Sequence, residues 1–222
     1  YYSKYDILLE GRDPEEFKKH VAVQAQIEIG LEKFLEDGDY HAIVTHFGML
    51  GGLKQLPGLA IQRLMEKGYG FGGEGDVTSA AATVLMANLA GAANFTEMFS
   101  MDPAHDAVLM MHMGEGNWTM ARKDEPIHML RSTLGLVELK VAPLLLAFSL
   151  EPGNVTLLSL TTAQDGRLRF VVAEGEVMDF PYVADLGRPH YKFRPNSTDG
   201  LPGFLTRFSL AGGSHHQALA YG

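Results

Sequence analysis

The sequence predicts an α/β protein in two parts: a layered β-α-β-α sheet domain at residues 1–93 and an antiparallel, β-rich and barrel-like domain at residues 94–222. Two observations support this prediction. As far as residue 92, amphipathic helical segments alternate with short apolar runs, which is the pattern of parallel strands covered by helices. From residue 94 onward, short runs of β-forming residues are separated by turn residues, as is typical of an antiparallel sheet or barrel.

Composition sets limits on the function. The chain has 222 residues, of which 46% are hydrophobic and 20% charged, as expected of a soluble globular protein with a sizeable core. Its formal net charge of −9, without any run of Lys and Arg, argues against nucleic acid as a partner. Cysteine is absent, so a metal ion would have to be bound by His, Asp and Glu.

The two ends of the chain give further expectations. No apolar segment approaches the roughly 20 residues that span a bilayer, and the N-terminus lacks the basic and then apolar residues of a signal peptide. We therefore expect no membrane partner and a cytoplasmic location. The chain begins at Tyr1 without an initiator Met and stops at Gly222 shortly after a pair of histidines, so we expect it to be a fragment.

The first helix is predicted at about residues 14–37. Asp13 precedes Pro14 and is followed by Glu16, the order of an N-cap, a first helical residue and a capping box. Apolar residues at helical spacing give the segment an amphipathic pattern that stops near residue 38; they are Val23, Ile27, Leu31 and Phe34.

A short apolar run at residues 40–45 predicts a buried parallel strand, with His46 and Phe47 at its carboxyl end. Ligands of open α/β sheets bind at that edge, so these residues are candidates for the wall of a site. His46 is also compatible with an ordinary hydrogen-bonded loop histidine, and both interpretations stay open.

A second helix at residues 59–67, a short strand at 69–71 and a third helix at 78–92 complete the first part. The most glycine-rich run, residues 68–76, includes this short strand and, after it, Glu74. Glycine permits backbone conformations that let another group lie close to the main chain, as at a binding site. The same run is typical of a tight turn whose acids, such as Asp76, cap the next helix. Local sequence does not separate the two.

In the second part, strands are predicted at residues 95–99, 108–113, 141–148, 155–161 and 168–173, with turns at 151–154 and 164–166. Both faces of the 108–113 strand are apolar, so we expect His112 to be enclosed. Near the end of the chain, His215 and His216 follow a glycine-rich turn. Adjacent residues of a strand point to opposite faces, so at most one of the two faces a given site.

Several motifs resemble the L-arabinose isomerase family. The longest is the stretch from residue 48 to 76, in which residues 52–60, 62–65 and 68–76 match without gaps. Further motifs follow in the family's order at residues 95–97, 112–113 and 211–216, so the resemblance covers nearly the whole chain. The chain departs from the family at Val77, Met98 and Gly114, which leaves the preferred aldose open.

The resemblance implies a role for particular residues. Glu74, Glu97, His112 and His216 match the family's metal ligands, and two carboxylates with two imidazoles suit Mn²⁺ or Co²⁺. We hypothesise that Glu74 and Glu97 also share the catalytic proton transfers. Phe47, Asp76 and Met113 are the candidates for substrate binding, and Asp76 is equally compatible with a helix cap or a position behind the metal ligands. His215 is left with a supporting role.

The resemblance also implies an activity: a metal-dependent aldose–ketose isomerase acting on L-arabinose and L-ribulose, and on D-galactose and D-tagatose, by proton transfer through an enediol. It implies a homo-oligomer in which a neighbouring subunit completes each active site. Because the family has a further domain before this region, we expect the isolated chain to be poorly active. A metal-dependent hydrolase and a non-catalytic sugar- or metal-binding module are the alternatives.

Overall fold

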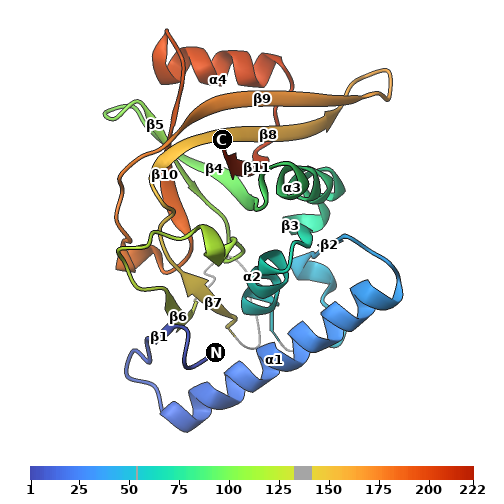
Figure 1. Cartoon of the computed structure of the whole chain (residues 1–222), viewed down its shortest axis with the longest axis vertical. Coiled ribbons are helices and arrows are strands. Elements are labelled where there is room, and N and C mark those ends of the chain that lie inside the picture. Colours follow the sequence, from blue (N-terminus) through green and yellow to red (C-terminus); the bar gives the residue numbers. More distant parts are fainter. Residues whose placement is uncertain (54, 133–141) are drawn as a thin grey trace.

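A computed structural model describes residues 1–53, 55–132 and 142–222 (Figure 1). Lys54, in the predicted family motif, and Val141, at the start of a predicted strand, lie outside the described residues. The first part contains β1 (Asp6–Ile7), α1 (Pro14–Asp37), β2 (Ala42–Val44), η1 (Phe47–Met49), α2 (Gly58–Glu66), β3 (Gly70–Gly72), η2 (Gly73–Gly75) and α3 (Val77–Ala90). Among the described helices, none is long and apolar enough to cross a bilayer.

Helix α1 begins and ends where the sequence predicts. The backbone N–H of Glu16 donates to the Asp13 side chain at 2.9 Å, which confirms the N-cap. The buried face differs from the predicted apolar stripe, since Phe34 is 57% exposed. That face includes Gln24, whose amide donates to the Gln55 side chain at 2.9 Å and to the Leu56 carbonyl at 2.8 Å. Polar residues can occupy it because α2 and the loop before it supply partners.

The two short strands of the first part form a parallel pair. Ala42 of β2 lies opposite Gly70 of β3, and Val44 lies opposite Gly72. Within the described residues this sheet has two strands, because β1 joins β6 instead. The helices and strands predicted for the first part are therefore present, but a larger layered sheet is not confirmed.

The second part contains β4 (Asn94–Asp102), β5 (Ala107–Met111), η3 (Trp118–Met120), β6 (His128–Arg131), β7 (Leu144–Ala147), β8 (Gly153–Thr162), β9 (Leu168–Val177), η4 (Ala184–Leu186), β10 (His190–Pro195), α4 (Gly200–Leu210) and β11 (His216–Tyr221). Strands β1, β6 and β7 form a small sheet of their own. Figure 1 shows α4 lying along one side of the long β8–β9 ribbon and α3 lying on the opposite side of it.

Six antiparallel strands form the main sheet in the order β10-β5-β4-β11-β8-β9, which confirms the antiparallel character predicted for this part. Strands β9 and β10 also pair, but through three residues, whereas β8 and β9 pair over ten. The strand order therefore closes without the even pairing of a regular barrel. Inside, the core contains Val108, Met110, Val155, Leu157, Tyr191, Phe193 and Leu219.

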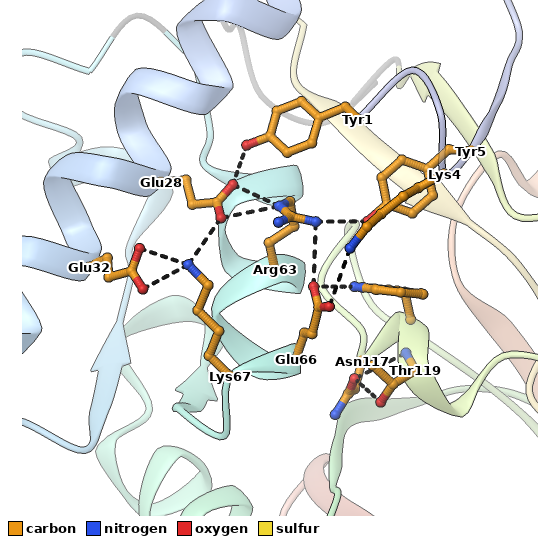
Figure 2. A network of polar contacts seen from close by, with 11 residues as sticks. Tyr1, Lys4, Tyr5, Glu28, Glu32, Arg63, Glu66, Lys67, Asn117 and Thr119 are labelled. Carbon is orange, nitrogen blue, oxygen red and sulfur yellow. Dashed lines mark hydrogen bonds and ion pairs between the residues drawn. The ribbon is translucent and has the colours of Figure 1, made fainter.

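A network of polar contacts joins α1, α2 and the N-terminal segment (Figure 2). Arg63 of α2 donates through Nε to both carboxylate oxygens of Glu28 on α1, at 2.9 and 3.1 Å, and through Nη1 to the Tyr5 hydroxyl at 3.0 Å. We call this the Glu28–Arg63 network; its other members are Tyr1, Lys4, Glu32, Glu66, Lys67 and Trp118.

Candidate metal centre

The candidate site lies where the start of α3, the β4–β11 pair and the end of β5 meet. In the register of β4 and β11, His216 is directly opposite Glu97, so the two side chains share one face of the sheet. Strand β5 ends at Met111, two residues before the end of the strand predicted at 108–113, so His112 follows the strand and does not lie within it. His112 is 5% exposed, so the expectation that it is enclosed is confirmed.

The two histidines and Glu97 form a compact group. One atom from each of Glu97, His112 and His216 lies within 4.8 Å of the others. The imidazole rings of His112 and His216 are 5.2 Å apart between centroids, at 72° to each other. Both Nε2 atoms are buried, and among the described residues neither has a hydrogen-bond partner. A buried polar atom without a partner is costly, so two such atoms beside a carboxylate indicate a place for a ligand.

Glu74 also lies near His216. Its carboxylate is 4.0 Å from His216 Nε2, and Glu74, His215 and His216 also offer atoms within 4.8 Å of one another. Glu74 has φ of 56°, in the left-handed region that few residues other than glycine adopt. The backbone N–H of Gly75 donates to the Thr45 carbonyl at 2.9 Å, which ties this turn to the end of β2.

The glycine-rich run does permit a close approach, but to a side chain of the protein itself. A Cβ atom at Gly73 would lie 2.8 Å from Cε1 of His112 and 3.3 Å from the Phe95 ring. The absence of a side chain at this position therefore makes room for the His112 ring. Phe95 in turn contacts both imidazoles, with ring centroids 4.8 Å from His112 and 5.1 Å from His216.

Two further carboxylates lie behind the histidines. Glu115 Oε2 is 2.7 Å from His112 Nδ1, and Asp76 Oδ2 is 3.1 Å from His216 Nδ1. Asp76 also caps α3, because the backbone N–H of Ser79 donates to it at 3.0 Å. Sequence reasoning missed Glu115 and Phe95 as site residues. The only feature of the sequence that could have indicated Glu115 is its position three residues after His112, which was expected to be enclosed.

A cavity of about 300 Å³ opens beside this group. Its walls contain five of the predicted site residues: Phe47, Glu74, Glu97, His112 and Met113. The other lining residues are Thr45, Leu56, Gly73, Phe99 and Glu115. The predicted His216 and Asp76 lie behind the wall. A larger cavity of about 600 Å³ between β8, β9 and β10 is lined by none of the predicted site residues.

His46 does not join the group of possible ligands. Its ring stacks on Phe47, with centroids 4.7 Å apart, and its Nδ1 accepts from the backbone N–H of Gly48 at 3.1 Å. These contacts are those of an ordinary hydrogen-bonded loop histidine. Its effect on the cavity is indirect, through the position of Phe47.

Two family models match the chain, and together they cover it from end to end. The model of the L-arabinose isomerase central domain matches residues 1–92, and the model of the L-arabinose isomerase C-terminal domain matches residues 92–222. The chain belongs to the L-arabinose isomerase family.

Curated relatives of this L-arabinose isomerase family member agree. L-arabinose isomerase 1 of Bacillus licheniformis is 35% identical over 229 residues, which cover 99% of this chain and 44% of the relative. L-arabinose isomerase of Geobacillus stearothermophilus is 35% identical over 232 residues, covering 100% of this chain and 44% of the relative. That of Escherichia fergusonii is 35% identical over 230 residues, covering 100% and 45%. The chain thus spans somewhat under half the length of these relatives.

Burial is the largest single cause of the pKa shifts of Glu97, His112 and His216 in this family member. Burial raises the pKa of Glu97, and the charge of Glu74 raises it further, against the opposing effect of His112. Burial lowers the pKa of His216, and the neighbouring histidines lower it further. For His112, burial lowers the pKa, but the carboxylates of Glu115, Glu97 and Glu74 together outweigh burial and the net shift is upward.

Asp76 behaves differently from the other acids of the site. Burial raises its pKa, but hydrogen bonds from Ser79, Thr78 and His216 outweigh burial and hold the pKa at about 2. Asp76 is thus a fixed negative charge. The two groups of possible ligands share His216: one adds Glu97 and His112, and the other adds Glu74 and His215. Their imidazole and carboxylate donors fit a divalent ion of the manganese or cobalt kind.

Proposed function

We propose that this chain is the metal-binding part of an aldose–ketose isomerase that interconverts L-arabinose and L-ribulose, and also D-galactose and D-tagatose. The proposal is supported by family membership and by one observation of the site. Nε2 of His112 and Nε2 of His216 are buried, have no hydrogen-bond partner among the residues that the structure describes, and lie near Glu97. In an ordinary core, buried polar atoms are hydrogen-bonded, whereas in a metal site these nitrogen atoms are kept free to bind the ion.

Glu74, Glu97, His112 and His216 would hold the metal ion, which we propose to be Mn²⁺ or Co²⁺. When bound, it would act as a Lewis acid toward the oxygens of the sugar, where negative charge develops during isomerisation. The neutral imidazoles contribute lone pairs from inside the protein. The carboxylates contribute negative charge at the cavity wall, where the sugar would lie.

Isomerisation moves a hydrogen between C1 and C2 of the sugar and a proton between O1 and O2. Glu74 and Glu97 both line the cavity, so both can take up a proton and return it. We propose that they share these two transfers. Phe47 and Met113 line the same cavity and would contact the carbon chain of the sugar, together with Phe99.

The partners follow from the same proposal. Phe47 and Phe99 line the cavity and are themselves exposed, so the cavity wall presents aromatic surface on its open side. We propose that the open side is covered in a homo-oligomer, in which a neighbouring subunit completes the pocket for the open-chain aldose.

The test is the formation of L-ribulose from L-arabinose by the chain, with and without added Mn²⁺ and with a Glu97→Gln variant. Mn²⁺-dependent formation of L-ribulose that is lost in the variant supports the proposal. Because the chain spans under half the length of its relatives, we expect this formation to be slow. Binding of Mn²⁺ without any L-ribulose above the rate of the metal-free chain would instead indicate a binding module. Mn²⁺-dependent hydrolysis of a sugar ester or glycoside by the same preparation would indicate a hydrolase.

The proton-transfer route has its own test in heavy water. If Glu74 and Glu97 exchange protons with the solvent, the ketose product carries deuterium at C1. A product without deuterium at C1 or C2 would mean that the hydrogen moves directly between the two carbons. In that case the two glutamates would keep their place around the metal and lose their role at carbon.

A further inference from the structure

Each buried histidine of the candidate metal centre presents its Nδ1 to a carboxylate that is not among the four proposed ligands. We propose that Glu115 and Asp76 are positioning residues, which fix the tautomers of His112 and His216 so that both Nε2 lone pairs face the space beside Glu97. The functional meaning of this inference rests on the proposed metal site. Its structural content is independent of it, because tautomers exist without a metal.

The pair of His112 and Glu115 is formed within one tight turn. Glu115 Oε2 lies 2.7 Å from His112 Nδ1, and both side chains are buried. Between them, Gly114 has φ of 134°, and a Cβ there would lie 2.6 Å from the Leu145 side chain. The turn therefore brings the acid back behind its own histidine at a place where only glycine fits.

The chemistry of the two groups decides where the proton lies. An ionised carboxylate accepts hydrogen bonds and cannot donate, so the bond to Glu115 requires a proton on His112 Nδ1. A neutral imidazole carries one proton, so its Nε2 then holds a lone pair. That Nε2 is the buried, unpartnered atom near Glu97. The same argument applies to His216, whose Nδ1 lies 3.1 Å from Asp76 Oδ2.

Asp76 is held firmly for this purpose. Its Oδ1 accepts from Thr78 Oγ1 at 2.6 Å and from the Ser79 backbone N–H at 3.0 Å, while its Oδ2 accepts from Ser79 Oγ at 2.6 Å. All of these donors belong to the first turn of α3. Asp76 is not among the residues that line the cavity. These contacts favour an action through His216 over the direct contact with substrate that the sequence predicts.

Packing already restrains the planes of both rings. Phe95 touches both imidazoles, and the backbone at Gly73 lies against His112. The contribution of the carboxylates is therefore the choice of tautomer more than the placement of the ring. In metal sites generally, loss of such an outer carboxylate costs about 10–100-fold in metal affinity.

Variants with an amide in place of each carboxylate separate the effect on the histidine tautomer from the effect of side-chain shape. Glu115→Gln and Asp76→Asn keep the size of each side chain, but an amide can donate as well as accept, so it no longer dictates a proton on Nδ1. Asn is also a good N-cap, so Asp76→Asn keeps the cap of α3. The matched control is Asp13→Asn, which makes the same change at the N-cap of α1, away from the site.

Two measurements test the inference. Long-range ¹H–¹⁵N NMR of the metal-free chain, at alkaline pH, shows which ring nitrogen carries the proton; we expect Nδ1 for both histidines. Calorimetric titration with Mn²⁺ should show about 10–100-fold weaker binding for Glu115→Gln and Asp76→Asn, and no change for Asp13→Asn.

The outcomes are distinguishable from those of the proposed function. Protons on Nε2 in the unmodified chain, or Mn²⁺ affinities of both amide variants equal to that of the unmodified chain, would overturn the inference. Failure of the unmodified chain to bind Mn²⁺ would count against the proposed metal site, and the NMR result alone would then decide the tautomers. The unmodified chain supplies that result even if a variant fails to fold.

Discussion

The Glu28–Arg63 network and the candidate metal centre both combine acidic and basic side chains around buried members, but they differ in pairing. In the network, Glu28 is 5% exposed and accepts hydrogen bonds from Arg63, Lys67 and Tyr1. Within the described residues, no buried side-chain atom of the network lacks a partner. In the metal centre, Nε2 of His112 and Nε2 of His216 both lack one.

The difference teaches what each cluster is for. Arginine is always charged and has five donors, so it can satisfy a buried carboxylate completely and leave nothing over for a ligand. Histidine can be neutral and keeps one lone pair free when its other nitrogen is engaged. The network should therefore be important for stability and the metal centre for binding. Changes to one should leave the main property of the other intact.

The largest effect is expected from Arg63→Met. This change leaves the buried Glu28 without its main partner, and breaking such a pair costs about 3–5 kcal/mol in the free energy of unfolding. Urea denaturation followed by circular dichroism measures it. Folded Arg63→Met should bind Mn²⁺ as the unmodified chain does.

The control for Arg63→Met is Lys33→Met, which breaks the exposed pair of Lys33 and Asp37, joined at 2.8 Å along α1. Exposed pairs of this kind contribute about 0.3–0.5 kcal/mol. A loss as small in Arg63→Met as in Lys33→Met would show that the network is not a stabilising unit.

The second effect is stabilisation by metal. A ligand that binds only the native state at 100 times its Kd raises the free energy of unfolding by about 2.7 kcal/mol. We expect this increment from Mn²⁺ in the unmodified chain and in Arg63→Met alike, and no increment in His216→Ala. Denaturation at a fixed excess of Mn²⁺ measures all three. An increment retained in His216→Ala would mean that the ion binds elsewhere.

The two clusters also differ in how far the sequence could predict them. The four proposed ligands were found through motifs whose order resembles a known family, and Glu97 and His216 do lie opposite each other. The network was not predicted. Glu28 and Arg63 are 35 positions apart on two different helices, and nothing local to either residue signals the other.

Elements set by local chemistry were predictable, and elements set by distant pairing were not. The Asp13 N-cap fixed the start of α1 correctly. Helix α4 was not predicted, because glycine and proline are typical of loops and its first turn contains Gly200, Pro202 and Gly203. A proline in the first turn of a helix nevertheless loses no helical hydrogen bond. The position of Glu115 depends on the turn at Gly114 and its fit against Leu145, which no spacing rule contains.

A third effect, of intermediate size, is expected from Gly73→Ala, because the backbone at Gly73 packs against the His112 ring of the metal centre. In Gly73→Ala, the new Cβ would lie 2.8 Å from Cε1 and 3.1 Å from Nε2 of His112, so the ring must move. Overpacking of this kind costs about 1–3 kcal/mol. In Gly73→Ala both the Mn²⁺ affinity and the free energy of unfolding should fall, whereas in Arg63→Met only the free energy of unfolding should fall.

The control for Gly73→Ala is Gly52→Ala, at a position where a Cβ meets nothing within 4 Å. Calorimetric titration and urea denaturation of both variants make the comparison. Unchanged Mn²⁺ binding in Gly73→Ala would show that the position of His112 is not important for the site.

The smallest effect is expected from Gly30→Ala, and it tests whether the two regions are independent. Gly30 lies on the exposed face of α1 with nothing within 4 Å of an added Cβ, between two members of the network, Glu28 and Glu32. Alanine in a helix interior is favoured over glycine by about 0.5–1 kcal/mol, because alanine has less backbone freedom than glycine in the unfolded chain and so loses less of it on folding. Changes at distant sites without shared partners add, so the gain from Gly30→Ala and the gain from Mn²⁺ should sum within about 0.5 kcal/mol. A sum outside that margin would mean that α1 and the metal centre are coupled, and the separation between a stabilising cluster and a binding cluster would fail.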